Sequence, residues 1–219
     1  MDLVIFAHPQ RMGSHNGALL QLVMETLKAS SRPFELIDLY ADGFDPLLNA
    51  QEYGVTVKVG TPRSDPLVAK YQQLITKAER LIFIYPVWWY GAPAMLKGFF
   101  DRVFTPGFAY NFKKMPPIAA AVKPVLPALC SIGACYPIFL SQMPVDKKLA
   151  GKRAIVVNTY GGGAEGFSLF GRAPEFSVDK AVLGFCGISP VKRISWWEAR
   201  GEPIVPERVK KQIEEALAR

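Results

Sequence analysis

Short, largely apolar runs recur along the chain, and a stretch with helical periodicity follows each one. Most of these runs are continuous rather than alternating, as in parallel strands buried on both faces. We predict strands over residues 3–7, 34–39, 81–85, 153–158 and 190–196. We predict helices over residues 14–30, 66–78, 93–104, 176–185 and 207–218, with Ser14 as the N-cap of the first.

The alternation of strands and helices sets the fold class. Five strand–helix repeats predict an α/β protein whose parallel sheet is covered on both faces. A length of 219 residues, without internal repeats or a low-complexity linker, predicts one domain over residues 1–219. Two stretches interrupt the pattern: an irregular one over 40–63, and an apolar insertion over 113–148 between the third helix and the fourth strand.

Composition narrows the class of protein. Half of the residues are hydrophobic and 21% are charged, which is ordinary for a soluble domain. The three cysteines form no CxxC pair and indicate reduced thiols in the cytoplasm. The net charge of +7 favours an anionic partner, and a phosphorylated cofactor or an anionic membrane surface explains it. No basic run exceeds two residues and no nucleic-acid module is recognisable, so we expect no nucleic-acid partner.

Residues 115–145 are mostly apolar, with Lys123 as their only charge. The length suits a transmembrane helix, but prolines recur through the segment, and each one removes a helical hydrogen bond and bends the chain. We therefore expect no spanning helix here. The segment has three interpretations that stay open: a lid over a binding site, a peripheral contact with the inner face of a membrane, and a dimer interface.

The loop over residues 8–16 joins the first strand to the first helix. A helix N-terminus exposes unpaired amides and partial positive charge, which makes it a site for anions. Ser14 and Asn16 offer hydrogen bonds to phosphate oxygens, and His8 or Arg11 offers charge. The alternative is that Ser14 only caps the helix and His8 is a hydrogen-bonded loop residue. The loop lacks the spacing of a P-loop or of GxGxxG.

Three consecutive aromatic residues, Trp88, Trp89 and Tyr90, follow the third strand. Gly91 and Pro93 then prevent the strand from continuing. Because open α/β sheets bind ligands beyond the carboxyl ends of their strands, this run is well placed to stack on a flat ring such as a flavin. The alternative is that the indoles pack in the core or at an interface.

A glycine triplet, 161–163, follows the fourth strand. Its backbone can approach a ligand closely, and its amides can bind a pyrimidine edge and stabilise negative charge there. A flexible turn is the alternative. The chain has no HExxH, CxxC or GxSxG motif, and its two histidines lie in one loop. We therefore expect no metal site and no hydrolytic triad, and we expect a bound cofactor to carry any reaction.

Taken together, the three loops resemble the flavodoxin-like NAD(P)H dehydrogenase (quinone) family. The strongest part is the run PVWWYGAPAMLKG over 86–98, continued by DRVF over 101–104 and GFAY over 107–110. The resemblance implies a flavodoxin-like three-layer sandwich with a five-stranded parallel sheet in the order 2-1-3-4-5. It also implies a homodimer with FAD or FMN at the strand ends. We favour FAD because the stretch 40–63 offers room for an adenosine.

The resemblance also assigns residues to the site. It implies that Ser14 and Asn16 hold the flavin phosphate, with His8 and His15 beside it. The implied contacts of the flavin ring are Pro86, Val87, Trp88, Trp89, Tyr90, Thr159, Tyr160, Gly161 and Gly162. The implied catalytic positions are Tyr160, Gly161 and Gly162, and the implied substrate contacts are Tyr110 and Phe167.

The implied activity is that of an NAD(P)H:quinone oxidoreductase with a ping-pong mechanism, in which the nicotinamide donor leaves before the quinone enters. Two features depart from the family pattern: well-studied members carry a Tyr and a His where this chain has Phe167 and Ala173, and the apolar segment 113–148 is longer than expected between these elements. Either solvent protonates the product, or another group such as Tyr160 does, or the protein prefers a different acceptor. The same site also suits reduction of azo or nitro compounds, or a flavin-binding, redox-sensing accessory subunit of a membrane system.

Overall fold

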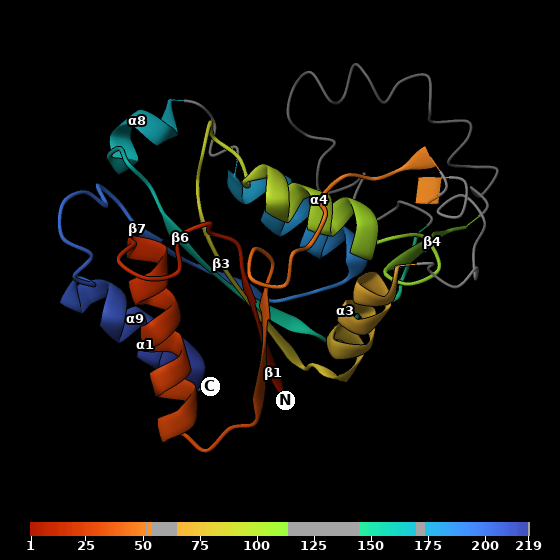
Figure 1. The fold of residues 1–219 in the computed structure, drawn as a ribbon, viewed down its shortest axis with the longest axis horizontal. Helices are drawn as coiled ribbons and strands as arrows, with labels where there is room; N and C mark the ends of the chain where they lie inside the picture. The colour runs from red at the N-terminus through yellow and green to blue at the C-terminus, as the bar shows by residue number, and fades with distance from the viewer. Residues whose placement is uncertain (51, 54–64, 114–144, 170–173, 219) are drawn as a thin grey trace.

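A five-stranded parallel sheet forms the centre of the protein. The structure is a computed structural model that describes residues 1–50, 52–53, 65–113, 145–169 and 174–218. The strand order is β2-β1-β3-β6-β7 (Figure 1). The strands are β1 (Asp2–Phe6), β2 (Phe34–Asp38), β3 (Arg80–Pro86), β6 (Arg153–Thr159) and β7 (Val191–Trp196). Numbered among themselves, the five strands follow the order 2-1-3-4-5, which confirms the predicted flavodoxin-like fold.

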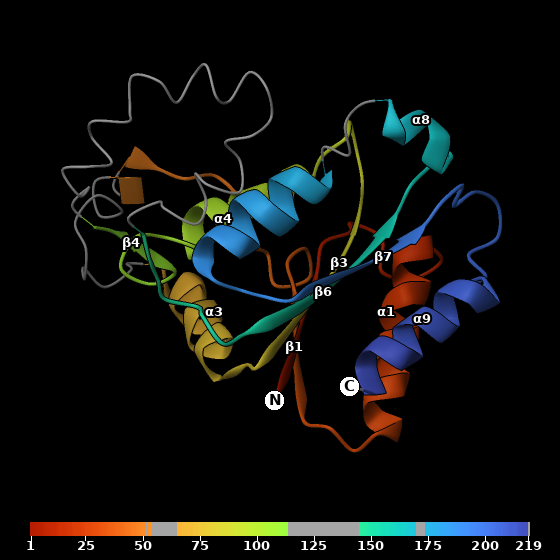
Figure 2. The same ribbon diagram turned by 180° about the vertical axis from the view of Figure 1, so that it is seen from behind.

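Helices cover both faces of this sheet, which gives three layers. The helices are α1 (His15–Ala29), α3 (Pro66–Lys77), α4 (Ala94–Val103), α8 (Ala164–Ser168), η1 (Glu175–Gly184) and α9 (Glu207–Ala218). Helices α1 and α9 lie on one face, and α3, α4 and η1 lie on the other (Figures 1 and 2). The predicted helices agree with the observed ones within two residues at each end.

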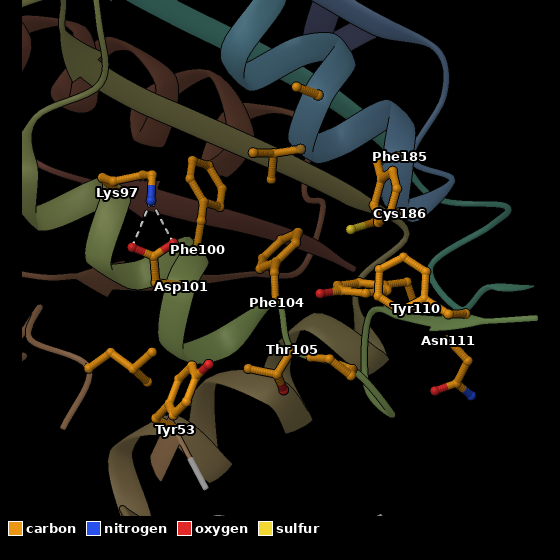
Figure 3. Close-up of a pocket in the computed structure, with 15 residues that line it drawn as sticks. Tyr53, Lys97, Phe100, Asp101, Phe104, Thr105, Tyr110, Asn111, Phe185 and Cys186 are labelled. Carbon is orange, nitrogen blue, oxygen red and sulfur yellow. Dashed lines mark hydrogen bonds and ion pairs between the residues drawn. The ribbon is translucent and has the colours of Figure 1, made fainter. Parts of the chain in front are cut away.

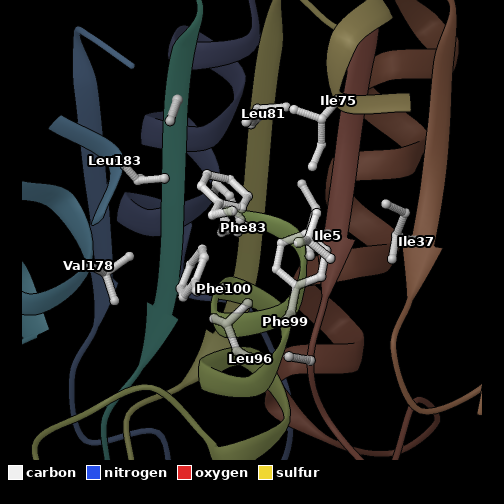
Figure 4. Packing of buried hydrophobic residues seen from close by; sticks show 14 of the residues in the cluster. Ile5, Ile37, Ile75, Leu81, Phe83, Leu96, Phe99, Phe100, Val178 and Leu183 are labelled. Atoms are coloured by element: carbon white, nitrogen blue, oxygen red, sulfur yellow. The ribbon is translucent and has the colours of Figure 1, made fainter. Parts of the chain in front are cut away.

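Alternate residues of the central strand β3 serve the two helical layers. Ile82 and Ile84 pack with α1 and α9, whereas Leu81 and Phe83 pack with α3, α4 and η1. In the second of these clusters, Phe83 lies 5.7 Å from Phe100 of α4 between ring centroids (Figure 4). Every residue of β3 is buried, which explains its continuous apolar pattern.

Local sequence explains where two of the helices begin. The Ser14 side chain accepts a hydrogen bond from the Gly17 amide, and the Asp65 side chain accepts one from the Leu67 amide. Both residues are preferred N-caps, and Pro66 in the first turn of α3 has no amide hydrogen to leave unpaired. These caps account for where α1 and α3 begin.

Three features were not predicted. Strand β4 (Tyr110–Phe112) pairs antiparallel with β5 (Val145–Lys147), α8 follows the glycine triplet, and η1 is a π-helix. Strands of three residues and a helix of five are too short to leave a periodic signal in the sequence. The β4–β5 pair joins the two ends of the apolar insertion, whose residues 114–144 lie outside the described part, so its role stays a prediction.

Neither a spanning helix nor a metal cluster occurs in the described part of the chain. No helix there combines the length and the apolar character needed to cross a membrane. Within the same ranges, no group of three His, Cys, Asp or Glu side chains is placed to hold a metal ion.

Candidate active site at the carboxyl edge of the sheet

The three loops singled out in the sequence lie at one edge of the sheet. Strands β1, β3 and β6 are neighbours and run parallel, so the segments that follow them leave the sheet together. At this edge the Ala7 amide donates to the Ile84 carbonyl at 3.0 Å, and the Val87 amide donates to the Thr159 carbonyl at 2.9 Å. The loops at 8–14, 87–93 and 160–163 are therefore adjacent, as binding beyond the strand ends requires.

The first loop folds back onto the start of α1. The Ser14 hydroxyl donates to the Gln10 carbonyl at 2.5 Å and accepts from the Gly17 amide at 3.0 Å. Glycine is needed at 17 because a Cβ there would lie 1.8 Å from the Arg11 carbonyl oxygen. Among the described residues, the amides of His15 and Asn16 have no hydrogen-bond acceptor. Ser14 thus acts as a cap, and the helix still presents free amides to an anion.

Asn16 links the first loop to the third. Its Nδ2 donates to Thr159 Oγ1 at 2.7 Å across 143 residues of sequence, and the side chain is buried. Its Oδ1 is buried without a hydrogen-bond donor in the described part of the chain, and so is His15 Nε2, whose ring lies edge-on to Trp196. Buried polar atoms are rarely left unpaired, so Asn16 Oδ1 points to a missing donor.

The second loop makes a tight turn with two aromatic residues at its tip. Trp88 and Gly91 exchange backbone hydrogen bonds of 3.1 and 3.0 Å. Between them, Trp89 and Tyr90 have φ values of 49° and 57°, which usually require glycine or asparagine. Each such residue costs roughly 1–3 kcal/mol, and strain of this kind concentrates at functional sites. Trp89 is 98% exposed, so it does not pack in the core of this chain.

The third loop is held by its carbonyl groups. The amide of Ala199 donates to the Tyr160 carbonyl at 2.9 Å, and the amide of Glu198 donates to the Gly162 carbonyl at 3.1 Å. Arg200 Nε donates to the carbonyl between them, that of Gly161, at 2.7 Å. Three consecutive carbonyls are therefore fixed by one neighbouring segment, which argues against a flexible turn.

The amides of the same loop are left available. In the described residues, the amides at 161–163 have no acceptor. A Cβ added at Gly161 or at Gly162 would meet no atom within 4 Å, so open space adjoins both residues. A row of fixed, unpaired amides beside open space can bind the oxygen and nitrogen atoms of a ring edge without rearrangement.

A cavity of about 310 Å³ lies between the second and third loops. Its lining consists of one valine, three aromatic residues and four glycines: Val87, Trp89, Tyr90, Phe167, Gly161, Gly162, Gly163 and Gly166. The rings of Tyr90 and Phe167 lie 4.6 Å apart between centroids and close one side. We call this the aromatic cavity. It joins flat apolar walls to the free amides, as suits a planar heterocycle.

Tyr160 does not present its hydroxyl to the aromatic cavity. Its side chain is buried, stacks on Trp197 at 4.0 Å, and accepts a hydrogen bond from Arg193 Nη1 at 3.3 Å. Burial raises the pKa of the Tyr160 hydroxyl, and the charge of Arg193 offsets only part of that rise. Only the backbone of Tyr160 therefore lies among the groups that the resemblance assigns to the flavin ring.

Tyr110 lies apart from Phe167. It lines a cavity of about 870 Å³ between α4 and η1, together with Phe104, Phe185 and Cys186 (Figure 3). This cavity shares no described lining residue with the aromatic cavity. Burial raises the pKa of Cys186 to about 12, so the thiol is protonated and poorly nucleophilic. Its volume alone does not make this cavity the active site, since its described lining is mostly apolar.

Sequence reasoning missed a buried polar network beneath the glycine loop. Arg193 of β7 forms two hydrogen bonds of 2.8 and 2.6 Å with the Asp179 carboxylate of η1, and it also donates to Asn158 Oδ1. Burial alone lowers the pKa of Arg193, but the bonded Asp179 carboxylate outweighs it and raises the pKa above its usual range. The available signal was an arginine in a strand that ends at the same edge of the sheet as the glycine loop.

The fold is that of a flavodoxin-like α/β protein, and its three loops lie together at the carboxyl edge of the sheet. The family model described as a flavodoxin-like fold (Flavodoxin_2) matches residues 3–219, so the chain belongs to this family, as its motifs predicted. NAD(P)H dehydrogenase (quinone) 1 of Cavia porcellus is 33% identical over 127 residues, which cover 52% of this chain and 46% of that relative. The chain thus matches about half the length of this relative.

Two further similarities extend over more of the chain. Ribosyldihydronicotinamide dehydrogenase (quinone) of Pongo abelii is 27% identical over 206 residues, covering 84% of this chain and 76% of that protein. The crystal structure of Smu.1420 from Streptococcus mutans UA159 superposes with a TM-score of 0.70 at 26% identity, covering 99% of this chain and 96% of that one.

Proposed function

We propose that this protein is a flavin-dependent NAD(P)H:quinone oxidoreductase. The observation that carries the proposal is the row of unpaired amides at 161–163, fixed opposite a strained aromatic turn. Relatives named as quinone dehydrogenases support the same class of reaction. When bound, the flavin supplies two-electron transfer from NAD(P)H to a quinone in a ping-pong sequence.

The residues at the edge fit a flavin at both of its ends. The amides of His15 and Asn16 at the start of α1 suit a phosphate, and the unpaired Asn16 Oδ1 suits a hydroxyl donor such as the sugar-alcohol chain carries. The amides at 161–163 suit the pyrimidine edge of the ring, and Trp89 and Tyr90 suit its apolar face. We favour FAD over FMN because of the long connection after β2, although residues 54–64 of it lie outside the described part.

The chain's own groups perform three tasks in this proposal. The fixed amides stabilise negative charge at the ring edge without the cost of reorienting a dipole. The aromatic walls hold donor and acceptor in turn against one face of the ring. Because the described lining of the aromatic cavity holds no carboxyl, imidazole or amine group, we propose that water protonates the product.

Assembly and location form part of the same proposal. We propose a cytoplasmic homodimer, in which a second chain brings Tyr110 to an acceptor that Phe167 of the first chain contacts. Support comes from the separation of these two residues within one chain, since they line different cavities. Sedimentation velocity of the purified protein tests the dimer, and a monomer at micromolar concentration would contradict it.

The decisive experiment is a visible spectrum of the purified protein, followed by titration with FMN and FAD and turnover with NADH or NADPH and benzoquinone. Asn16→Ala should weaken flavin affinity by about 10- to 100-fold, because it removes a buried polar contact. Asn111→Ala, which changes the same residue type on β4, should leave affinity unchanged. A colourless protein that takes up neither flavin would sink the proposal, and tight binding without turnover would favour the accessory-subunit role.

A further inference from the structure

Phe167 separates two cavities. On one side it lines the aromatic cavity of about 310 Å³. On the other side it lines a second cavity of about 440 Å³, which lies between α8, η1 and β7. Among the described residues, Phe167 is the only one that lines both. The two spaces therefore meet at a single aromatic side chain.

The second cavity is polar, and we call it the polar cavity. Three aromatic rings form part of its wall: those of Phe167, Tyr160 and Trp197. Its polar lining comes from Ser168, Glu175, Asp179, Arg193 and Ser195. Arg193 and Asp179 pair with each other at 2.6 Å, so these two charges balance, and Glu175 adds a further carboxyl group to the lining. Such a lining accepts a flat group that carries neutral hydrogen-bonding substituents.

Neighbouring rings hold Phe167 in place. Its centroid lies 4.6 Å from that of Tyr90, 4.7 Å from Tyr160 and 5.4 Å from Trp197. It belongs to α8, which begins directly after the glycine triplet. A half-buried ring with contacts on three sides is a fixed wall rather than a freely rotating side chain.

We infer that Phe167 determines the size of the acceptor, an inference that rests on the proposed function. With the ring in place, the space beside the bound flavin ends at Phe167 and admits one-ring acceptors. With the ring removed, the polar cavity becomes continuous with it and admits a second, hydroxylated ring. The substrate class of the native protein is then small quinones, and the polar cavity is a latent extension of the acceptor site.

The test compares flavin-loaded wild type and Phe167→Ala with benzoquinone and a hydroxynaphthoquinone. The ratio of kcat/KM for the two-ring to the one-ring acceptor should rise by about 10-fold in Phe167→Ala, a typical effect of pocket size. Calorimetric titration without donor should show a matching gain in affinity for the hydroxynaphthoquinone. Leu169→Ala is the matched control, because this neighbour is 84% exposed and lines neither cavity.

A second variant tests whether the higher kcat/KM ratio of Phe167→Ala comes from the polar cavity. Ser168 lines the polar cavity alone, so Ser168→Leu should leave the wild-type ratio unchanged and cancel the gain when combined with Phe167→Ala. An unchanged ratio in folded, flavin-bound Phe167→Ala would overturn the inference, as would a gain that Ser168→Leu does not cancel. If wild type binds flavin but turns over neither quinone, the proposed function fails, and the calorimetric affinities still decide the role of Phe167.

Discussion

The two ends of the parallel sheet treat their polar groups in opposite ways. At the amino end, the buried Arg80 donates to both carboxylate oxygens of Asp2, at 3.0 and 2.6 Å, and to the carbonyls of Ala216 and Leu217 at the end of α9. At the carboxyl edge, the amides at 161–163 lack acceptors within the described chain, and Trp89 and Tyr90 have positive φ values.

This difference separates stability from binding within one sheet. Saturated donors at the amino end lock the first strand, the third strand and the last helix together, but leave nothing for a ligand. Unpaired donors and strained residues at the carboxyl edge lower stability and leave binding capacity. A buried charged side chain whose hydrogen-bonding groups are paired within the protein, such as Arg80, is therefore weak support for a functional site.

The largest expected effect comes from breaking the amino-end cluster. Arg80→Ala leaves the fully buried Asp2 carboxylate with one partner, Arg32, and should lower the free energy of unfolding by about 3–5 kcal/mol. Arg32→Ala removes the partly exposed partner of the same carboxylate and should cost about 1 kcal/mol or less. Urea denaturation of the three proteins measures both effects.

Flavin titration of the same variants tests the separation of the two ends. Both arginine variants should bind flavin with wild-type affinity under conditions in which they are folded, because Arg80 and Arg32 lie at the opposite end of the strands. A tenfold loss of affinity in folded Arg80→Ala would show that the two ends are coupled. An equal loss of stability in both variants would show that burial does not matter here.

A smaller effect is expected from relieving strain at the carboxyl edge. Residue 89 has a φ of 49°, which glycine adopts without strain. Trp89→Gly should therefore raise the free energy of unfolding by about 0.5–1 kcal/mol, after the extra chain entropy of glycine is subtracted. The same change should weaken flavin affinity about 10-fold, because an aromatic surface is lost. Thermal denaturation and flavin titration measure the two results.

Ser31→Gly is the matched control for this prediction. Ser31 has a φ of 54° but lies in the turn between α1 and β2, near the amino end. It should gain a similar stability and keep its affinity for flavin. Equal affinities of both variants would remove Trp89 from the site, and a loss of stability in Trp89→Gly would show that its backbone is not strained.

Much of the fold could be predicted from the sequence because its signals are local. Continuous apolar strands, the Ser14 cap and the proline at the start of α3 each act within a few residues, and the order of the strands followed from the family resemblance. The β4–β5 pair could not be predicted, since its two strands of three residues are held by contacts across a long insertion.

The site was only partly accessible to the same reasoning. Glycines and aromatics at strand ends indicated which loops matter, but not that Tyr160 turns its hydroxyl into the polar cavity. That placement depends on Arg193 of β7 and on Trp197, which directly follows β7 in the sequence. Spacing along the chain cannot show which side of a loop a side chain will take when its partners are this far away in sequence.

A further prediction concerns the ion pair between Asp65 and Arg102, which lies away from the amino-end cluster. Asp65, the N-cap of α3, lies 2.6 Å from Arg102 Nη2. Partial burial by itself raises the pKa of Asp65, but the hydrogen bond and charge of Arg102 and the Leu67 amide outweigh it, so the pKa is lowered. A carboxyl with a lowered pKa in the folded state stabilises the fold above its unfolded pKa, and this contribution is lost as the pH falls through the folded pKa.

Asp65→Asn keeps the cap and removes the charge, so it should cost up to about 1 kcal/mol at pH 7, and the difference from wild type should shrink below about pH 4. Asp101→Asn breaks only an exposed pair with Lys97 and should cost less than about 0.5 kcal/mol at neutral pH. Urea denaturation at a series of pH values measures this. Because Asp65 is already paired within the protein, Asp65→Asn should change stability alone. A change in its flavin affinity would contradict the idea that only groups without a partner in the chain, such as the amides at 161–163, bind the flavin.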